Sequence, residues 1–501
     1  MNERQCGQRK PTVLIIGAGI GGIGLGVSLL RAGFTEFTIL ERAGDIGGVW
    51  RENTYPGAAC DVPSPLYSYS FAPNPSWPRR YSRQPDILDY LRRTAAGTGV
   101  LDRVRCDTEV TGARFDEAGH TWEVATATGQ TYTADVLVSA VGQLSRPVLP
   151  RIPGAEKFTG PLFHSARWEH GVDLTGKRIA VIGTGASAVQ FVPQLQPTAR
   201  RLTVFQRSAP YVVPRPDRGY RPWHHRMFRW LPGTQLIGRA ATWLVSEFLN
   251  LALTTAQPLG KLVRGAFHLH LRHQVEDPEL RARLTPDYQI GCKRLLFSND
   301  WYPALTQPNV NVVTDSIAEI TEHGVRTADG LLHPAEVIIY GTGFAATEFL
   351  APMRIQGRHG QYLGEEWAEG ARAYLGMTVP GFPNMFCVYG PNTNLGGSSI
   401  IFMMEQQFGY ILQVLRRIAD GTVSCVDVRR YVADVYDAEM QRRLGESVWS
   451  GCASWYREDS GRISTNWPGL VSEYRRRTAR LDLTDYEDIG AGDRRQSVGV
   501  A

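Results

Sequence analysis

The sequence lacks several features, and each absence excludes a class of protein. No apolar run among its 501 residues is long enough for a membrane span, because the longest candidate, 236–253, is interrupted by Arg239 and Glu247. No two cysteines form a Cys-x-x-Cys motif, which excludes a zinc ribbon and a dithiol flavin reductase. Because 54 basic residues nearly balance 49 acidic ones, a protein that binds nucleic acid through a strong basic field is also excluded.

The seven cysteines are odd in number and scattered, at positions 6, 60, 106, 292, 387, 425 and 452. A disulfide framework has an even number of cysteines at regular spacings, so we expect buried free thiols in a reducing compartment. The amino-terminal residues 1–11 are polar and have no apolar core of the kind found in signal peptides. Both features predict a cytoplasmic protein.

Glycine, by contrast, is abundant with 52 residues, and it first gathers in a strand–turn–helix unit. Residues 12–16 have the pattern of a buried strand, 17–22 read Gly-Ala-Gly-Ile-Gly-Gly, and a second strand pattern at 37–40 ends on Glu41. An acid at that place can accept a hydrogen bond from a ribose hydroxyl. The unit therefore predicts a site for a cofactor with a free ribose diol.

Each glycine of this turn has a separate predicted role. Gly17 permits the tight turn, Gly19 lets the backbone approach a pyrophosphate, and Gly22 lets the helix pack against the strand. The amino terminus of that helix points at the phosphates.

A second unit of the same kind follows at 178–205. Its turn, 183–188, reads Gly-Thr-Gly-Ala-Ser-Ala, and its second strand is followed by Gln206 and Arg207 instead of an acid. An acid would repel a 2′-phosphate, whereas an arginine can pair with one. The unit therefore predicts an NADPH site, to which we assign these cofactor-binding residues: Gly183, Gly185, Ser187, Arg207 and Ser208.

Two nucleotide units in one chain indicate that NADPH hands a hydride to FAD. The expected fold is α/β with two Rossmann-like domains, the NADP domain inserted in a discontinuous FAD domain. The FAD domain would comprise 1–145 and 335–501, and the NADP domain 146–334. The strand pattern at 336–340 is expected to return the chain to the FAD domain.

The region 216–286 is an aromatic-rich insert whose apolar residues recur at helical spacing. We favour a helix packed on its own domain. A cap over an apolar substrate tunnel and a surface that rests on a membrane remain alternatives. The five histidines of the insert lack acid or thiol partners at ligand spacing, so no metal site is predicted.

The segment before the second unit carries the pattern F-x-G-x-x-x-H-x-x-x-W, formed by Phe158, Gly160, His164 and Trp168. This pattern resembles the fingerprint of type I Baeyer–Villiger monooxygenases, which belong to the class B flavoprotein monooxygenases. The fit is full except for Glu169, where that family has Pro or Asp. The resemblance covers residues 13–474, and we assign the four fingerprint residues a hinge role between the domains.

The resemblance also implies roles for residues elsewhere in the chain. The segment 55–64 looks like the one that provides an active-site aspartate, here Asp61, and Lys293-Arg294 looks like the family's Lys-Arg pair. Lys293 would then hold the 2′-phosphate, and Arg294 would be catalytic with Asp61 beside it. Three further residues are implied to contact FAD: Gly48, Trp50 and Tyr67.

The implied reaction is a monooxygenation with FAD, NADPH and O2. A C4a-peroxyflavin adds to a ketone carbonyl, and the adduct rearranges to an ester or lactone. Arg294 would supply the fixed cation that the anionic peroxide needs, and Asp61 would hold that cation in place. The many aromatic residues favour a bulky, apolar ketone.

Other functions remain alternatives at this point. A related enzyme would oxygenate nitrogen or sulfur, an NADPH:flavin reductase would pass electrons to a partner, and a non-enzymatic module would only sense NADPH. The expected partners are the ketone and O2, without nucleic acid or a transmembrane segment. Peripheral membrane contact and the oligomeric state are left open.

Overall fold

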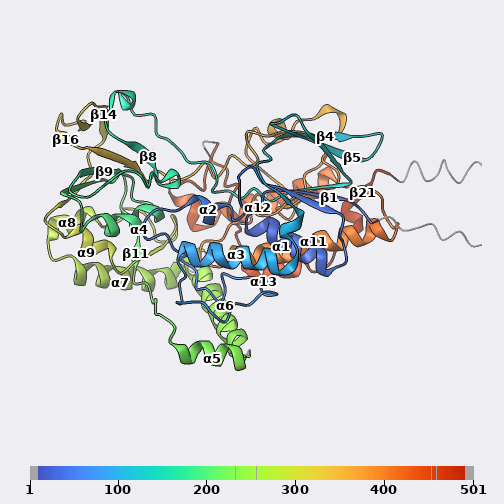
Figure 1. The fold of residues 1–501 in the computed structure, drawn as a ribbon, viewed down its shortest axis with the longest axis horizontal. Coiled ribbons are helices and arrows are strands. Elements are labelled where there is room, and N and C mark those ends of the chain that lie inside the picture. The colour runs from blue at the N-terminus through green and yellow to red at the C-terminus, as the bar shows by residue number, and fades with distance from the viewer. Residues whose placement is uncertain (1–9, 232, 255–256, 453, 459, 491–501) are drawn as a thin grey trace, which may run out of the picture.

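The computed structural model describes residues 10–490 except 232, 255–256, 453 and 459. Two five-stranded sheets lie side by side and form the centres of its two halves (Figure 1). In the first sheet, all the neighbouring strands run parallel. Its strands, in spatial order, are β19 (Met385–Cys387), β7 (Val136–Ser139), β1 (Val13–Ile16), β2 (Phe37–Leu40) and β3 (Val104–Arg105).

The second sheet is also parallel throughout. Its strands, in spatial order, are β13 (Val310–Val313), β10 (Arg201–Phe205), β9 (Arg178–Ile182), β17 (Val337–Tyr340) and β8 (Leu162–His164). The expectation that 336–340 belongs to the first half is wrong, because β17 pairs with β8 and β9. A short, fully buried apolar strand fits either parallel sheet equally well, so its sequence does not reveal which sheet it joins.

The chain passes between the halves along two connecting segments that pair with each other. The backbone N–H of Val148 donates to Gly343 O over 2.9 Å, and that of Ala345 donates to Arg146 O over 2.9 Å. The two segments that connect the halves, near residues 146 and 343, are thus hydrogen-bonded to each other, which limits how the two halves can move.

Smaller elements cover the two sheets. An antiparallel sheet over the first half consists of β4 (Val110–Asp116), β5 (Thr121–Thr126) and β6 (Thr131–Ala134), with β18 (Arg354–Gln356) added in parallel. The second half carries β14 (Ile317–Thr321), β15 (Gly324–Thr327) and β16 (Leu332–Pro334). The helices against the first sheet are α1 (Ile20–Arg31), α3 (Gln84–Thr98), α11 (Ile400–Ala419), α12 (Arg430–Gly445) and α13 (Val471–Thr478).

The insert forms four helices, of which α5 and α6 extend from the body as a projection while α7 lies along the second half (Figure 1). They are α5 (Pro222–Trp230), α6 (Gly233–Thr254), α7 (Gln257–Gln274) and the short α8 (Pro278–Arg283). The carboxyl ends of α6 and α7 contribute Leu253, Phe267 and Leu271 to the core of the second half. The far end of the projection, at α5, is distant from that core.

Candidate functional site

A cavity of about 1090 Å³ lies between the two halves, at the carboxyl ends of the parallel strands. Open α/β sheets bind their ligands at this edge. Both glycine turns line the cavity, together with nearly all residues that the sequence assigned to catalysis or cofactor binding. The lining includes Gly17, Gly19, Glu41, Gly48, Trp50, Asp61, Tyr67, Gly183, Gly185, Ser187, Arg207, Ser208, Lys293 and Arg294.

The first glycine turn packs closely because its glycines have no side chains. Gly17 has φ +103°, and a Cβ there would lie 2.8 Å from Ala140 O. A Cβ on Gly48 would lie 3.1 Å from the Cα of Gly19, so these two glycines face each other. Gly22 lies outside the cavity, where a Cβ would strike Gly17 O. This glycine turn at the amino terminus of α1 fits a pyrophosphate.

Glu41 lies at the end of β2 with its carboxylate fixed by the backbone. Oε2 accepts from the N–H of Ala18 over 2.9 Å, and Oε1 accepts from the N–H of Ala43 over 3.1 Å. The residue is buried yet borders the cavity. A carboxylate held in this way can accept a hydrogen bond from a ribose hydroxyl without rearranging.

The second glycine turn repeats the arrangement at the other end of the cavity. Gly183 has φ +106°, and a Cβ there would lie 2.5 Å from Gly341 O. Gly185 precedes α4 (Ala186–Leu195), which contains Ser187. The amino terminus of this helix therefore also faces the cavity and suits a phosphate.

Two cations face the same stretch of cavity beside this turn. Lys293 Nζ donates to Ser208 Oγ over 2.8 Å, next to Arg207. Burial and the positive charge of Arg207 lower the pKa of Lys293 below its usual value. A dianionic phosphate would relieve this repulsion, so the residues present fit the 2′-phosphate of NADPH.

Arg294 and Asp61, which are 233 residues apart in the sequence, both line the cavity and contact each other. Arg294 donates from Nε and Nη2 to the two carboxylate oxygens of Asp61, each over 2.8 Å. The charge of Asp61 raises the pKa of Arg294 above its usual value. A guanidinium held by a two-point contact keeps both its orientation and its charge.

The aromatic pair that was implied to contact FAD is also assembled. Trp50 Nε1 donates to Tyr67 Oη over 2.9 Å, and the rings meet edge to face at 5.6 Å. Both residues line the cavity between the first glycine turn and Asp61. Burial raises the pKa of Tyr67 well above its usual value, so the phenol stays neutral and can donate.

The four fingerprint residues lie outside the cavity, at the edge of the second sheet. His164 ends β8, and Trp168 packs edge to face on Phe163 at 5.3 Å. Phe158 packs beneath the same sheet, and a Cβ on Gly160 would strike Glu336 O. None of the four lines the cavity.

His164 makes stability depend on pH. Burial lowers the pKa of His164 to about 4, and Nδ1 accepts from the N–H of Ala166 over 3.0 Å. Below the ordinary pKa of histidine, this side chain is protonated in the unfolded chain but still neutral in the folded one. The free energy of unfolding therefore falls by about 1.4 kcal/mol per pH unit until about pH 4. We expect the Tm to fall more between about pH 7.5 and 5.5 for the native protein than for His164→Gln. Equal losses, measured by calorimetry, would contradict this.

Several residues of the site carry no sequence signal. In α4, Gln190 accepts from Tyr55 Oη over 3.1 Å and donates to Ala59 O over 3.0 Å, which ties the second half to the Asp61 segment. Tyr389 Oη donates to Asn394 Oδ1 over 2.8 Å at the cavity wall. Isolated polar residues of this kind could be found only through contacts, since no motif surrounds them.

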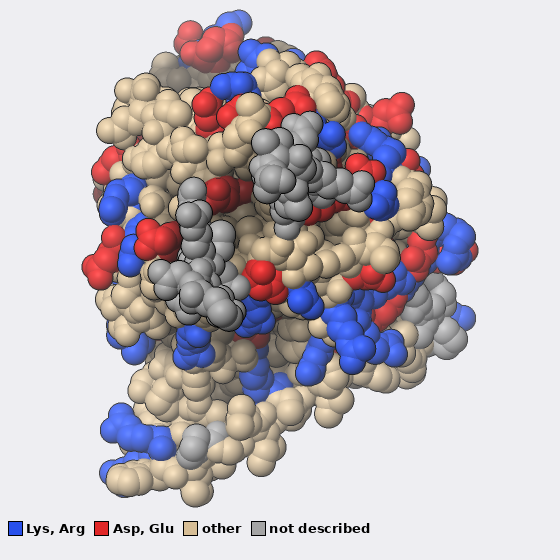
Figure 2. Space-filling model, turned by 90° about the vertical axis from the view of Figure 1, so that its right-hand side faces the viewer, with Lys and Arg blue, Asp and Glu red and all other residues tan. Residues whose placement is uncertain are grey.

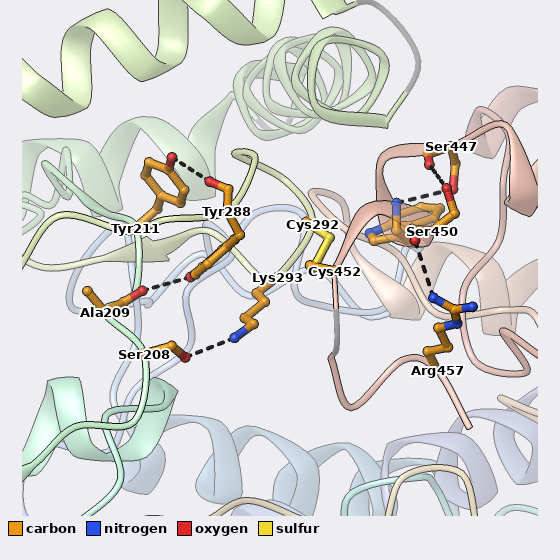
Figure 3. The surroundings of a disulfide bond; sticks show 11 residues. Ser208, Ala209, Tyr211, Tyr288, Cys292, Lys293, Ser447, Ser450, Cys452 and Arg457 are labelled. Atoms are coloured by element: carbon orange, nitrogen blue, oxygen red, sulfur yellow. Dashed lines mark hydrogen bonds between the residues drawn. A yellow bond between two sulfur atoms is a disulfide. The ribbon is translucent and has the colours of Figure 1, made fainter. Parts of the chain in front are cut away.

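The expectation that all cysteines are free is wrong. Cys292 and Cys452 form a disulfide immediately before Lys293 (Figure 3). It joins the Lys293-Arg294 loop to the carboxyl-terminal segment that supplies Trp455 to the cavity wall. The partners are 160 residues apart, so sequence spacing could not pair them. The four free cysteines among the described residues are Cys60, Cys106, Cys387 and Cys425.

The described part of the chain contains no group of three or more His, Cys, Asp or Glu residues that could hold a metal ion.

Comparison with known families and proteins gives consistent matches. Residues 10–353 match the model of the flavin-binding monooxygenase-like family. The chain is 45% identical over 490 residues to a Baeyer–Villiger monooxygenase of Streptomyces coelicolor, covering 97% of this chain and 94% of that protein. It is 41% identical over 481 residues to a Baeyer–Villiger monooxygenase of Pseudomonas aeruginosa, covering 95% and 91%.

Solved structures of similar fold agree with these matches. An oxidized steroid monooxygenase bound to NADP aligns with a TM-score of 0.84 at 30% identity, covering 94% of this chain and 97% of that one. A complex of OTEMO with FAD and NADP aligns with a TM-score of 0.87 at 28% identity, covering 96% and 100%. The closed structure of cyclohexanone monooxygenase aligns with a TM-score of 0.85 at 26% identity, covering 95% and 98%. The resemblance and the fold class predicted from the sequence are confirmed.

Proposed function

Because the chain belongs to the flavin-binding monooxygenase-like family, we propose that it oxidises bulky, apolar ketones to esters or lactones. It is an FAD- and NADPH-dependent monooxygenase of the Baeyer–Villiger type. Ketone, O2, NADPH and a proton give ester, water and NADP⁺, with one oxygen atom entering the product. When bound, NADPH supplies the hydride, and FAD accepts it and activates O2.

The observation that carries the proposal is the Arg294–Asp61 pair. It lines the same cavity as the two glycine turns, in which the redox ends of the two cofactors would have to come together. In this proposal Arg294 stabilises negative charge on the attacking oxygen and on the ketone oxygen, and Asp61 keeps the guanidinium aimed. Tyr456 and Tyr389 stand near Arg294, and burial raises the pKa of Tyr456 to about 12, which keeps it neutral.

We assign the remaining residues by their position in the cavity. The turn of Gly17 and Gly19, with Gly22 beneath it, would hold the FAD pyrophosphate and Glu41 its ribose. The residues proposed to pack beside the flavin are Gly48, Trp50, Asp61 and Tyr67. Those proposed to bind NADPH are Gly183, Gly185, Ser187, Arg207, Ser208 and Lys293.

The domain division follows the sheets. We propose an FAD domain of 1–145 and 341–501 and an NADP domain of 146–340, since β17 belongs to the second sheet. The fingerprint residues Phe158, Gly160, His164 and Trp168 would couple the occupancy of the NADP domain to its orientation. We also propose a cytoplasmic location, which is supported by the need for NADPH.

The proposed size and polarity of the substrate rest on the wall that remains beyond the cofactor residues. Leu395, Ile400 and Trp455 line the cavity and offer mostly apolar surface. Sites for apolar ligands are lined in this way, with few polar groups to orient the substrate.

The experiment that tests this function uses the FAD-loaded protein, NADPH and oxygen-18. A large polycyclic ketone should yield an ester with one labelled oxygen and a kcat/KM at least about tenfold above that of cyclohexanone. A preference for sulfides or amines over every ketone would contradict the ketone assignment. Consumption of NADPH that yields only hydrogen peroxide, with every ketone tested, would contradict it as well.

A further inference from the structure

Helix α6 packs on the body through Trp243 and Leu253 together with several polar side chains, and it leaves a largely apolar face exposed. The face turned to the body bonds through polar side chains: Arg239 donates to Ser68 O over 2.7 Å, and Asn250 Nδ2 donates to Gly469 O over 3.0 Å. Glu247 accepts from the N–H of Val471 over 2.9 Å. The opposite face is exposed and apolar, formed by Leu236, Ile237, Leu244, Val245, Phe248 and Leu251.

This exposed face continues onto the neighbouring helices. Of the 18 large hydrophobic residues that are exposed in the described part of the chain, 11 lie between positions 223 and 269. Trp230 at the end of α5 is 79% exposed, and Leu262 and Leu269 of α7 are 71% and 73% exposed. Exposed apolar residues concentrated in this way on neighbouring helices indicate an interaction site, because burying them from water is favourable.

The net charge of the same region indicates what kind of partner it binds. Residues 221–274 contain seven basic residues and one acidic residue, Glu247, a net charge of +6, while the whole chain has +5. The rest of the chain is therefore close to neutral, and Glu247 itself is buried against Val471. The lower projection in Figure 2 accordingly shows tan surface with blue at its edge. A second copy of this chain would bring two such cationic surfaces together, which is unfavourable.

We propose that α5, α6 and α7 form a docking surface for the anionic face of a lipid bilayer. The apolar side chains would enter the interface between headgroups and acyl chains, and the exposed basic residues would bind lipid phosphates. The basic residues concerned are Arg221, Arg226, Arg229, Lys261, Arg264 and Arg272. The helix packs on the body through its inner face, as the sequence predicts, and for its exposed outer face contact with a membrane is the alternative that we develop.

The helix would lie on the bilayer and not cross it. In the described residues α6 is the one helix whose length and composition would suffice for a span. Crossing would, however, break the bonds of Arg239, Glu247 and Asn250 to the first half of the protein. Buried polar groups without partners are costly in hydrocarbon, so the surface position is favoured.

The test is sedimentation of the FAD-loaded protein with vesicles of phosphatidylcholine alone or with about one third phosphatidylglycerol. We expect binding to the anionic vesicles that weakens with salt. Leu244→Gln/Val245→Gln/Phe248→Gln and, separately, Arg226→Glu/Arg229→Glu should weaken it at least about tenfold. The controls change exposed residues elsewhere in the same sense: Tyr431→Gln/Val435→Gln replaces two apolar residues, and Arg475→Glu/Arg476→Glu reverses two charges.

The outcomes separate this proposal from its competitors. Native protein that stays in the supernatant overturns it, as does binding that the two variants retain. A dimer in light scattering that the apolar variant converts to monomer, without vesicle binding, would instead assign the surface to a second copy. NADPH oxidation by each variant is measured in parallel, and unchanged turnover shows that the variants fold and leaves the proposed reaction standing.

Discussion

Arg294→Ala should bind FAD and accept a hydride from NADPH, yet lose ester formation by about 10³-fold or more. The reason is that, in the proposed function, the guanidinium is the fixed positive charge beside the reacting atoms, and two hydrogen bonds to Asp61 hold it in place. Removing one preorganised group that stabilises developing negative charge costs about 3–4 kcal/mol. NADPH oxidation should persist and become uncoupled, with hydrogen peroxide replacing ester as the product. Product chromatography and a peroxide assay on the same reaction measure both quantities.

Two conservative variants separate charge from geometry. Arg294→Lys keeps a cation without the planar fork, so its ester yield should fall between that of the native protein and that of Arg294→Ala. Asp61→Asn keeps the shape of the partner and removes its charge, which should loosen the guanidinium and lower kcat more than it raises KM. Full ester formation by Arg294→Ala would contradict the proposed role of this residue.

The features that could be predicted from the sequence are those for which local chemistry permits only one backbone arrangement. A Cβ on Gly17 or Gly183 would collide with a backbone carbonyl, so the two turns could be recognised from glycine spacing and strand pattern. The pairing of Asp61 with Arg294 could not be derived in this way, since 233 residues separate them. It came from a family resemblance, and spacing alone offers no signal for it.

Other features could not be predicted, because the sequence shows that a segment has a pattern but not which part of the protein that segment contacts. The apolar periodicity of α6 predicts one apolar side, yet nothing in it tells whether protein, ligand or lipid covers that side. Strand β17 would fit either parallel sheet, and it joins the second one. Cys292 and Cys452 are brought together by the packing of the carboxyl-terminal segment, which leaves no mark in their spacing.

Loss of either Arg207 or Lys293 should remove the preference for NADPH over NADH. Arg207 and Lys293 face the same stretch of cavity, and the pKa of Lys293 is lowered by burial and by Arg207, so this site is short of negative charge. A charged hydrogen bond to phosphate contributes about 1.5–3 kcal/mol, so Arg207→Ala and Lys293→Ala should each raise KM for NADPH by about 10–100-fold. KM for NADH should change by less than about threefold, because NADH has no 2′-phosphate.

Arg201→Ala is the matched control, since it removes an exposed arginine from the opposite end of the same strand β10. It should leave both Michaelis constants unchanged, which separates a local contact from a general loss of positive charge. Initial rates of flavin reduction under anaerobic conditions measure both constants without interference from the oxygen steps. An equal rise for NADPH and NADH would mean that Arg207 and Lys293 position the nicotinamide half of the cofactor, and the 2′-phosphate would then have to be bound by other residues.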